Sequence, residues 1–135
     1  MRKLLSTGYS AYAFNLALFI LRVGAGALMI HHGYDKLITF NQKAPNFMHF
    51  LGMSGTFSLA LVVFAEFFCS IFVMLGLFTR FACIFLLIST FVALSDAHNY
   101  DIFGKGEHVA LFFVIFLTIL IIGPGKISVD GMMNK

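Results

Sequence analysis

Four long apolar segments constrain the fold of this chain more than any other feature of its sequence. They cover residues 12–31, 57–78, 81–98 and 108–123. A helix needs about 20 apolar residues to cross the hydrocarbon core of a bilayer, and each segment is near or just below that length. Helices are expected rather than barrel strands, because lipid offers no hydrogen-bond partner to loose backbone groups and the segments are evenly apolar. The pattern predicts an all-α integral membrane protein, an antiparallel four-helix bundle.

The composition indicates that lipid, rather than water, is the main solvent of the chain. The 135 residues are 60% hydrophobic and 11% charged, whereas a soluble domain is about 25% charged. The length predicts a single domain over residues 1–135. The formal net charge of +3 is small and scattered, which argues against a nucleic-acid partner. Cys69 and Cys83 lie at different depths in apolar segments, so we expect buried thiols rather than a disulfide.

The connections between the segments differ in character. In the first loop, Pro45 is expected to begin a short helix along the membrane surface, with Phe47, Phe50 and Leu51 on one side and Gly52 as its stop. The second and third segments join through only Thr79-Arg80, which predicts a tight antiparallel hairpin.

The distribution of Lys and Arg favours both termini on the cytoplasmic side. In that orientation five basic residues lie inside and three lie outside. The inner set is Arg2, Lys3, Arg80, Lys126 and Lys135, and the outer set is Lys36, Lys43 and Lys105.

Arg22 and Glu66 are charged residues that an apolar segment should exclude. A charge at the bilayer centre costs about 3 kcal/mol on the lenient insertion scale, so each residue needs a partner or water. If the first helix ends at His31 and the second begins at Phe57, antiparallel packing places both side chains at the same depth. We therefore expect an Arg22–Glu66 ion pair. Its role stays open between a structural device that sets helix register and a proton or substrate site.

A second group of polar residues gathers where the segments end on the outer side. Histidines and carboxylates together suit proton exchange near neutral pH, although they also serve as interfacial anchors or metal ligands. His31 and His32 point about 100° apart on a regular helix, so no metal site is predicted. The group comprises His31, His32, Asp96, His98, Glu107 and His108.

Several short motifs also lie in a characteristic order along the chain. They are His32-Gly33 with Lys36 and Leu37, Glu66, the hairpin sequence at 75–80, Gly106-Glu107, and the closing Gly-Pro-Gly-Lys-Ile-Ser-Val-Asp at 123–130. Together they resemble the DoxX family of membrane proteins, and the closing motif is the most specific of them.

The resemblance implies a function as well as a four-helix bundle in the cell (inner) membrane. Some members of that family form the membrane subunit of a thiosulfate:quinone oxidoreductase, and another assembles with redox-stress enzymes. The implied function is a membrane subunit of a redox system that binds quinone within the bundle and exchanges protons. Glu66, Glu107 and His32 would act near the ring. The further ligand-binding candidates are Arg22, His31, Asp96, His98 and His108.

Two other functions stay open from the sequence. One is a non-catalytic adaptor that recruits a soluble redox enzyme, and the other is a small-solute transporter, which would need a homo-oligomer. The sequence shows no flavin, haem-c or iron–sulfur motif, so any electrons would come from a partner protein. Whether the chain is itself an enzyme is not decided by these patterns.

Overall fold

The computed structural model describes residues 4–47, 52–97, 103–104 and 106–133, and these residues form helices and loops without a strand. The first long helix, α1, spans Ala11–Ile38, and the Ser10 hydroxyl caps it by accepting from the Ala13 N–H at 3.1 Å. The prediction that this helix ends at His31 is wrong. The helix continues past its apolar segment with a polar last turn, whose backbone finds hydrogen-bond partners. The Thr39 hydroxyl, for example, donates to the Asp35 carbonyl at 2.7 Å.

Two short helical turns follow α1, ahead of most of the predicted surface helix. α2 spans Phe40–Lys43 and the 3-10 turn η1 spans Ala44–Asn46. Pro45 lies in the first part of this single tight turn, which begins at Ala44, and the backbone at Phe47 is extended. The predicted continuation through Phe50 and Leu51 lies outside the described residues.

The second long helix is built from three consecutive segments. α3 spans Gly55–Val63, the π-helical η3 spans Phe64–Cys69, and α4 spans Ser70–Leu75. Gly76 ends the helix in a left-handed conformation with φ of 73°, which explains why it stops before Phe78. By length and composition, α1 and the stretch Gly55–Leu75 are each able to cross a membrane.

The remaining helices are shorter. α5 spans Thr79–Val92 and continues as the π-helical turn η4, Ala93–Ala97. α6 spans Glu107–Ile122, and the short α7 spans Val129–Met133. The predicted segments 81–98 and 108–123 correspond to α5 with η4 and to α6, within one or two residues where the structure describes their ends.

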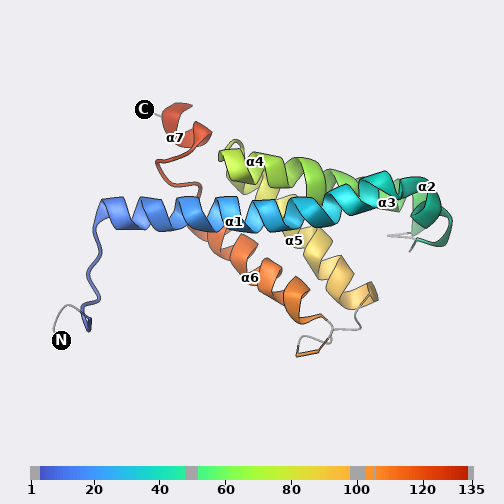
Figure 1. The fold of residues 1–135 in the computed structure, drawn as a ribbon, viewed down its shortest axis with the longest axis horizontal. Helices are drawn as coiled ribbons and strands as arrows, with labels where there is room; N and C mark the ends of the chain where they lie inside the picture. The colour runs from blue at the N-terminus through green and yellow to red at the C-terminus, as the bar shows by residue number, and fades with distance from the viewer. Residues whose placement is uncertain (1–3, 48–51, 98–102, 105, 134–135) are drawn as a thin grey trace.

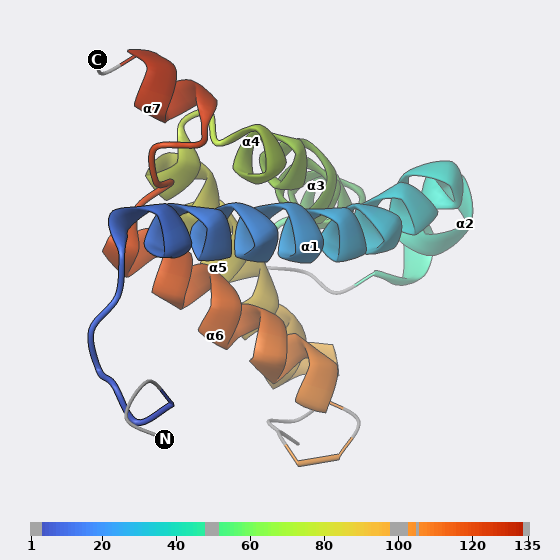
Figure 2. The same cartoon turned by 60° about the vertical axis from the view of Figure 1, so that its left-hand side comes forward.

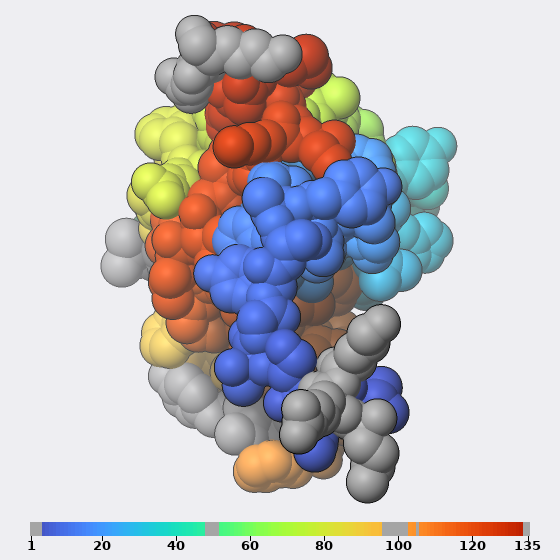
Figure 3. All heavy atoms as spheres, turned by 90° about the vertical axis from the view of Figure 1, so that its left-hand side faces the viewer, coloured from blue at the N-terminus to red at the C-terminus, as the bar shows by residue number. Residues whose placement is uncertain are grey.

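The long helices alternate in direction. Figure 1 shows the start of α1, the turn between α4 and α5 and the end of α6 at one end of the molecule, on the left. α2 and the start of α6 lie toward the opposite end. α1 packs along η3 and α4, whereas α5 packs on α6, and this second pair slants away from α1 (Figure 2). Figure 3 shows the α1 start against the C-terminal segment, where the Lys126 N–H donates to Asn15 Oδ1 at 2.8 Å.

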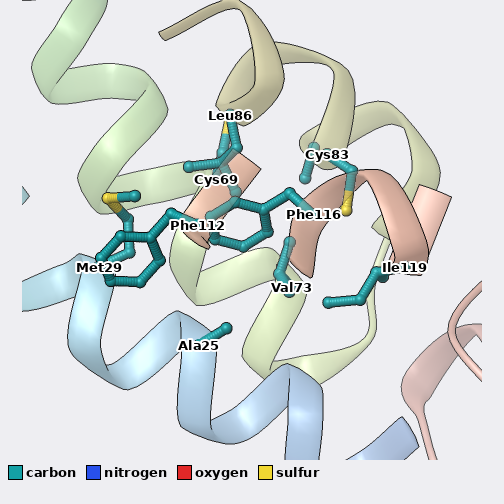
Figure 4. Close-up of a cluster of buried hydrophobic side chains, with 10 residues drawn as sticks. Ala25, Met29, Cys69, Val73, Cys83, Leu86, Phe112, Phe116 and Ile119 are labelled. Carbon is teal, nitrogen blue, oxygen red and sulfur yellow. The ribbon is translucent and has the colours of Figure 1, made fainter. Parts of the chain in front are cut away.

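The apolar core lies between these helices (Figure 4). Cys69 and Cys83 are both free and buried within it, which confirms the prediction of buried thiols. The labelled core residues are Ala25, Met29, Cys69, Val73, Cys83, Leu86, Phe112, Phe116 and Ile119.

Polar side chains share this interior while bulky apolar side chains cover the outside. The buried polar residues include Arg22, Ser58, Glu66, Ser70, Thr79 and Thr90. The exposed apolar residues include Ile20, Leu28, Phe81, Leu111 and Ile121. Water-soluble proteins rarely expose so many large apolar side chains, whereas membrane proteins turn their few polar residues inward.

Candidate functional site

Arg22 does not pair with Glu66, so the predicted ion pair is wrong. The Arg22 side chain is 1% exposed and donates through Nη1 to the carbonyl oxygens of Val73 and Met74, each at 3.1 Å. Its Nη2 donates to the carbonyl oxygen of Ile127. Arg22 therefore joins the C-terminal end of α4 to the segment that follows α6.

The register of α1 against η3 and α4 explains this correction. A Cβ added at Gly33 would lie 2.7 Å from the carbonyl carbon of Glu66, and one at Gly26 would lie 3.0 Å from the carbonyl oxygen of Ser70. Glu66 therefore faces Gly33, which is about 16 Å along α1 from Arg22 at ~1.5 Å per residue. The depth estimate failed because α1 is longer than its apolar segment.

The hairpin motif at 75–80 and the closing motif at 123–130 meet around Arg22. In the closing motif, Asp130 accepts from the N–H groups of Phe78 at 2.9 Å and Thr79 at 3.0 Å, which caps α5 from a distant part of the chain. A Cβ at Gly76 would overlap the Ser128 side chain and lie 2.6 Å from Arg22 Nη1. We call Arg22, Gly76, Ser128 and Asp130 the C-terminal junction. Its contacts serve the packing of the chain.

Glu66 instead pairs with Lys36, at 2.7 Å between Oε2 and Nζ. The Glu66 side chain is 8% exposed and the Lys36 side chain 25%. Gly33 makes this contact possible, since its missing side chain lets α1 approach the backbone of η3 closely. Glu66 also sits in a π-helical segment, a feature that is frequent at functional sites.

The Lys36–Glu66 pair lies in the wall of a cavity of about 270 Å³ between α1, the second long helix, α5 and α6. The His32 ring stacks on the His108 ring with centroids 5.9 Å apart, and it meets Phe112 edge-on at 5.9 Å. The lining residues are Met29, His32, Lys36, Phe47, Val62, Glu66, Ser89, Thr90, Val92, Ala93, His108, Val109 and Phe112.

Two hydroxyl groups from α5 also reach this wall. The Thr90 hydroxyl donates to the Leu86 carbonyl of its own helix at 2.9 Å. The Ser89 Oγ is buried without a hydrogen-bond partner in the described part of the chain. A buried hydroxyl without a partner costs free energy, so Ser89 is a candidate contact for a ligand.

The structure thus brings together three of the residues that the sequence singled out, namely His32, Glu66 and His108. His31 is exposed and lines an adjoining hollow between α1 and α6, which shares His32, His108 and Phe112 with the cavity. Glu107 is exposed in the first turn of α6 and does not line the cavity.

Two further candidates fall where side chains are not described. Asp96 lies in η4, but its side chain is not described, and His98 lies outside the described residues. Across the residues that are described, no group of three or more His, Cys, Asp or Glu gathers as a metal site.

Sequence reasoning missed Lys36 and Ser89 as site residues. Lys36 follows His32 by four positions, so the two share one helix face once α1 extends that far. It was placed in a loop because the helix was expected to end at His31. Ser89 and Thr90 were visible as adjacent hydroxyl residues between the apolar Ile88 and Phe91.

The polar interior, apolar exterior and two long apolar helices define the chain as an all-helical protein suited to lipid. The family model described as DoxX matches residues 17–99, more than half of the sequence. The chain belongs to the DoxX family. It is 28% identical over 127 residues to the "Inner membrane protein YqjF" of Escherichia coli (strain K12), an alignment that covers 90% of this chain and 95% of that protein. No solved structure matches the chain.

Proposed function

We propose that the chain is a multi-pass protein of the inner membrane, with α1, the stretch from α3 to α4, α5 and α6 as four antiparallel transmembrane helices. The alternating helix directions and the apolar exterior support this arrangement, as does the name of the relative from Escherichia coli. The distribution of basic residues favours both termini on the cytoplasmic side.

Reporter fusions test this topology. A green fluorescent protein fused after the last residue, Lys135, is expected to fluoresce, because both termini are proposed to be cytoplasmic. Alkaline phosphatase fused after Gly104, between η4 and α6, is expected to be active because this position would be periplasmic. Active phosphatase at the C-terminus would contradict the proposed orientation.

We further propose that the protein is the membrane subunit of a redox system and binds quinone in the cavity. The observation that carries this proposal is the composition of the cavity wall. Met29, Val92 and Phe112 provide an apolar surface for a flat ring. The Lys36–Glu66 pair and Ser89 provide polar groups for the ring carbonyls.

The same residues suit the proton chemistry of a quinone. Reduction to the quinol takes up two electrons and two protons. The electrons would come from a partner redox protein, since the sequence carries no recognisable motif for an electron-transfer cofactor. Glu66, His32 and His108 are the cavity groups able to exchange protons, and Lys36 and Ser89 are able to donate hydrogen bonds to the carbonyl oxygens. Glu107, exposed at the start of α6, would exchange protons with solvent.

Ser89→Ala tests the placement of the ring. In purified protein, a benzoquinone is expected to raise the melting temperature by binding the folded state. Ser89→Ala should weaken this binding about fivefold, equivalent to a lost hydrogen bond of ~1 kcal/mol. Stability without ligand should not fall, because Ser89 Oγ has no partner among the described residues. Thermal unfolding against quinone concentration measures both quantities.

Thr118→Val is the matched control. The Thr118 hydroxyl bonds to the Val114 carbonyl of its own helix at 2.8 Å and does not line the cavity, so quinone affinity should not change. An unaffected Ser89→Ala variant would reject this placement of the ring. No response of the wild-type protein to quinone would reject quinone binding itself and favour the adaptor or the transporter.

A further inference from the structure

A second cavity lies beside the first and has a different character. It has a volume of about 230 Å³ and lies between α3, η3 and α5. Apart from two serines, its lining is apolar: Ser58, Leu61, Val62, Phe64, Ala65, Phe85, Ile88, Ser89 and Val92. Because it carries no charged residue, it suits a hydrocarbon group rather than a polar ring.

The two cavities share part of their walls. Val62, Ser89 and Val92 line both of them. The Ser89 Oγ, which has no hydrogen-bond partner among the described residues, is therefore at the boundary between a polar cavity and an apolar one. A ligand that places a polar ring against Ser89 in the first cavity has the second cavity next to that ring.

The second cavity also reaches the outer surface of the helices. Three of its lining residues are substantially exposed, namely Leu61 at 39%, Phe64 at 41% and Ile88 at 48%. In the proposed transmembrane arrangement this surface faces lipid tails. The second cavity then lies between the bilayer and the polar cavity, against the wall that the two cavities share.

We infer that the second cavity holds the hydrocarbon chain of a lipid-soluble ring compound whose ring occupies the first cavity, and that this ligand enters from the bilayer between α3 and α5. The inference rests on the proposed function and narrows it to ligands with a long apolar chain. The hydrocarbon chain of the ligand gains little free energy on leaving lipid for the cavity, because lipid is as apolar as the protein interior. Its contribution to affinity therefore depends on close packing in the cavity, which a larger side chain would prevent.

Ile88→Trp tests the inference by filling the second cavity from its exposed rim. Affinities of the full-length protein in detergent are measured for two probes: a dimethoxy-methyl-benzoquinone without a chain, and the same ring with a decyl chain. The variant is expected to bind the decyl compound roughly tenfold more weakly, because overpacking excludes the chain. Affinity for the chainless ring is expected to be unchanged.

Ile84→Trp is the matched control. Ile84 lies one helical turn earlier on α5 and is 46% exposed, but it lines neither cavity. The affinities of the Ile84→Trp variant for both compounds should equal those of the wild-type protein. Unchanged decyl binding in Ile88→Trp, or equal weakening of both probes, would overturn the chain site while leaving quinone binding intact. Failure of both probes to bind the wild-type protein would overturn the proposed function and this inference with it.

Discussion

Replacing Arg22 with methionine is expected to lower the free energy of unfolding by about 4 kcal/mol, the largest effect of any single substitution considered for this protein. The guanidinium serves three carbonyl oxygens, those of Val73, Met74 and Ile127. Its removal leaves these acceptors without their donor in a site where Arg22 is 1% exposed. Reversible unfolding in mixed detergent micelles measures the loss.

Arg80→Met is the control for this substitution. Arg80 lies near the same end of the molecule, but it is exposed and makes one long hydrogen bond, 3.3 Å to the Ile122 carbonyl. Its loss should change stability by less than about 1 kcal/mol. A stability of Arg22→Met equal to that of Arg80→Met would contradict the structural role of the C-terminal junction.

Exchanging Arg22 and Glu66 tests the observed contacts of the two residues against the ion pair that the sequence predicts. An Arg22–Glu66 ion pair would let the double variant Arg22→Glu with Glu66→Arg recover the stability that each single variant loses. The structure predicts no recovery in the same unfolding measurement. The carboxylate introduced at position 22 would face three carbonyl oxygens as a further acceptor, and the guanidinium introduced at position 66 would meet Lys36 as a like charge.

Replacing Lys36 with methionine is expected to lower the free energy of unfolding by about 3 kcal/mol. The substitution leaves the Glu66 carboxylate, 8% exposed, without its partner at 2.7 Å. The double variant Lys36→Met with Glu66→Gln should recover most of the loss, because it removes both charges together. A double-mutant cycle of unfolding free energies measures the coupling between the two residues.

The exposed pair between Lys43 and Asp35 provides a control within the same region. Its atoms lie 2.9 Å apart, but the side chains are 43% and 58% exposed. Lys43→Met should therefore cost less than about 1 kcal/mol. Equal losses for Lys36→Met and Lys43→Met would mean that solvent screens the Lys36–Glu66 pair as well, and that Glu66 does not depend on it.

The helices themselves were largely predictable from the sequence by itself. An apolar run long enough to span lipid forms a helix, because its backbone groups have no other partner. This argument located the segments at 57–78, 81–98 and 108–123 to within a few residues. A tight turn between the second and third segments was also expected, but it lies at residues 76–78, and Thr79-Arg80 instead begin α5. The buried thiols were predicted correctly. The motif order was also sufficient to indicate the family.

The contacts of the charged residues were decided only by the tertiary structure. Hydropathy marks where a helix becomes polar and not where it ends, so the sequence did not reveal that α1 extends to Ile38. The estimated depth of Arg22 relative to Glu66 was therefore wrong. Gly33 sets the register by allowing η3 to approach, and this brings Glu66 to Lys36. Arg22 finds backbone carbonyl oxygens, which every residue carries and no sequence pattern distinguishes. Its partners therefore depend on how the C-terminal segment folds back, a long-range contact without local signal.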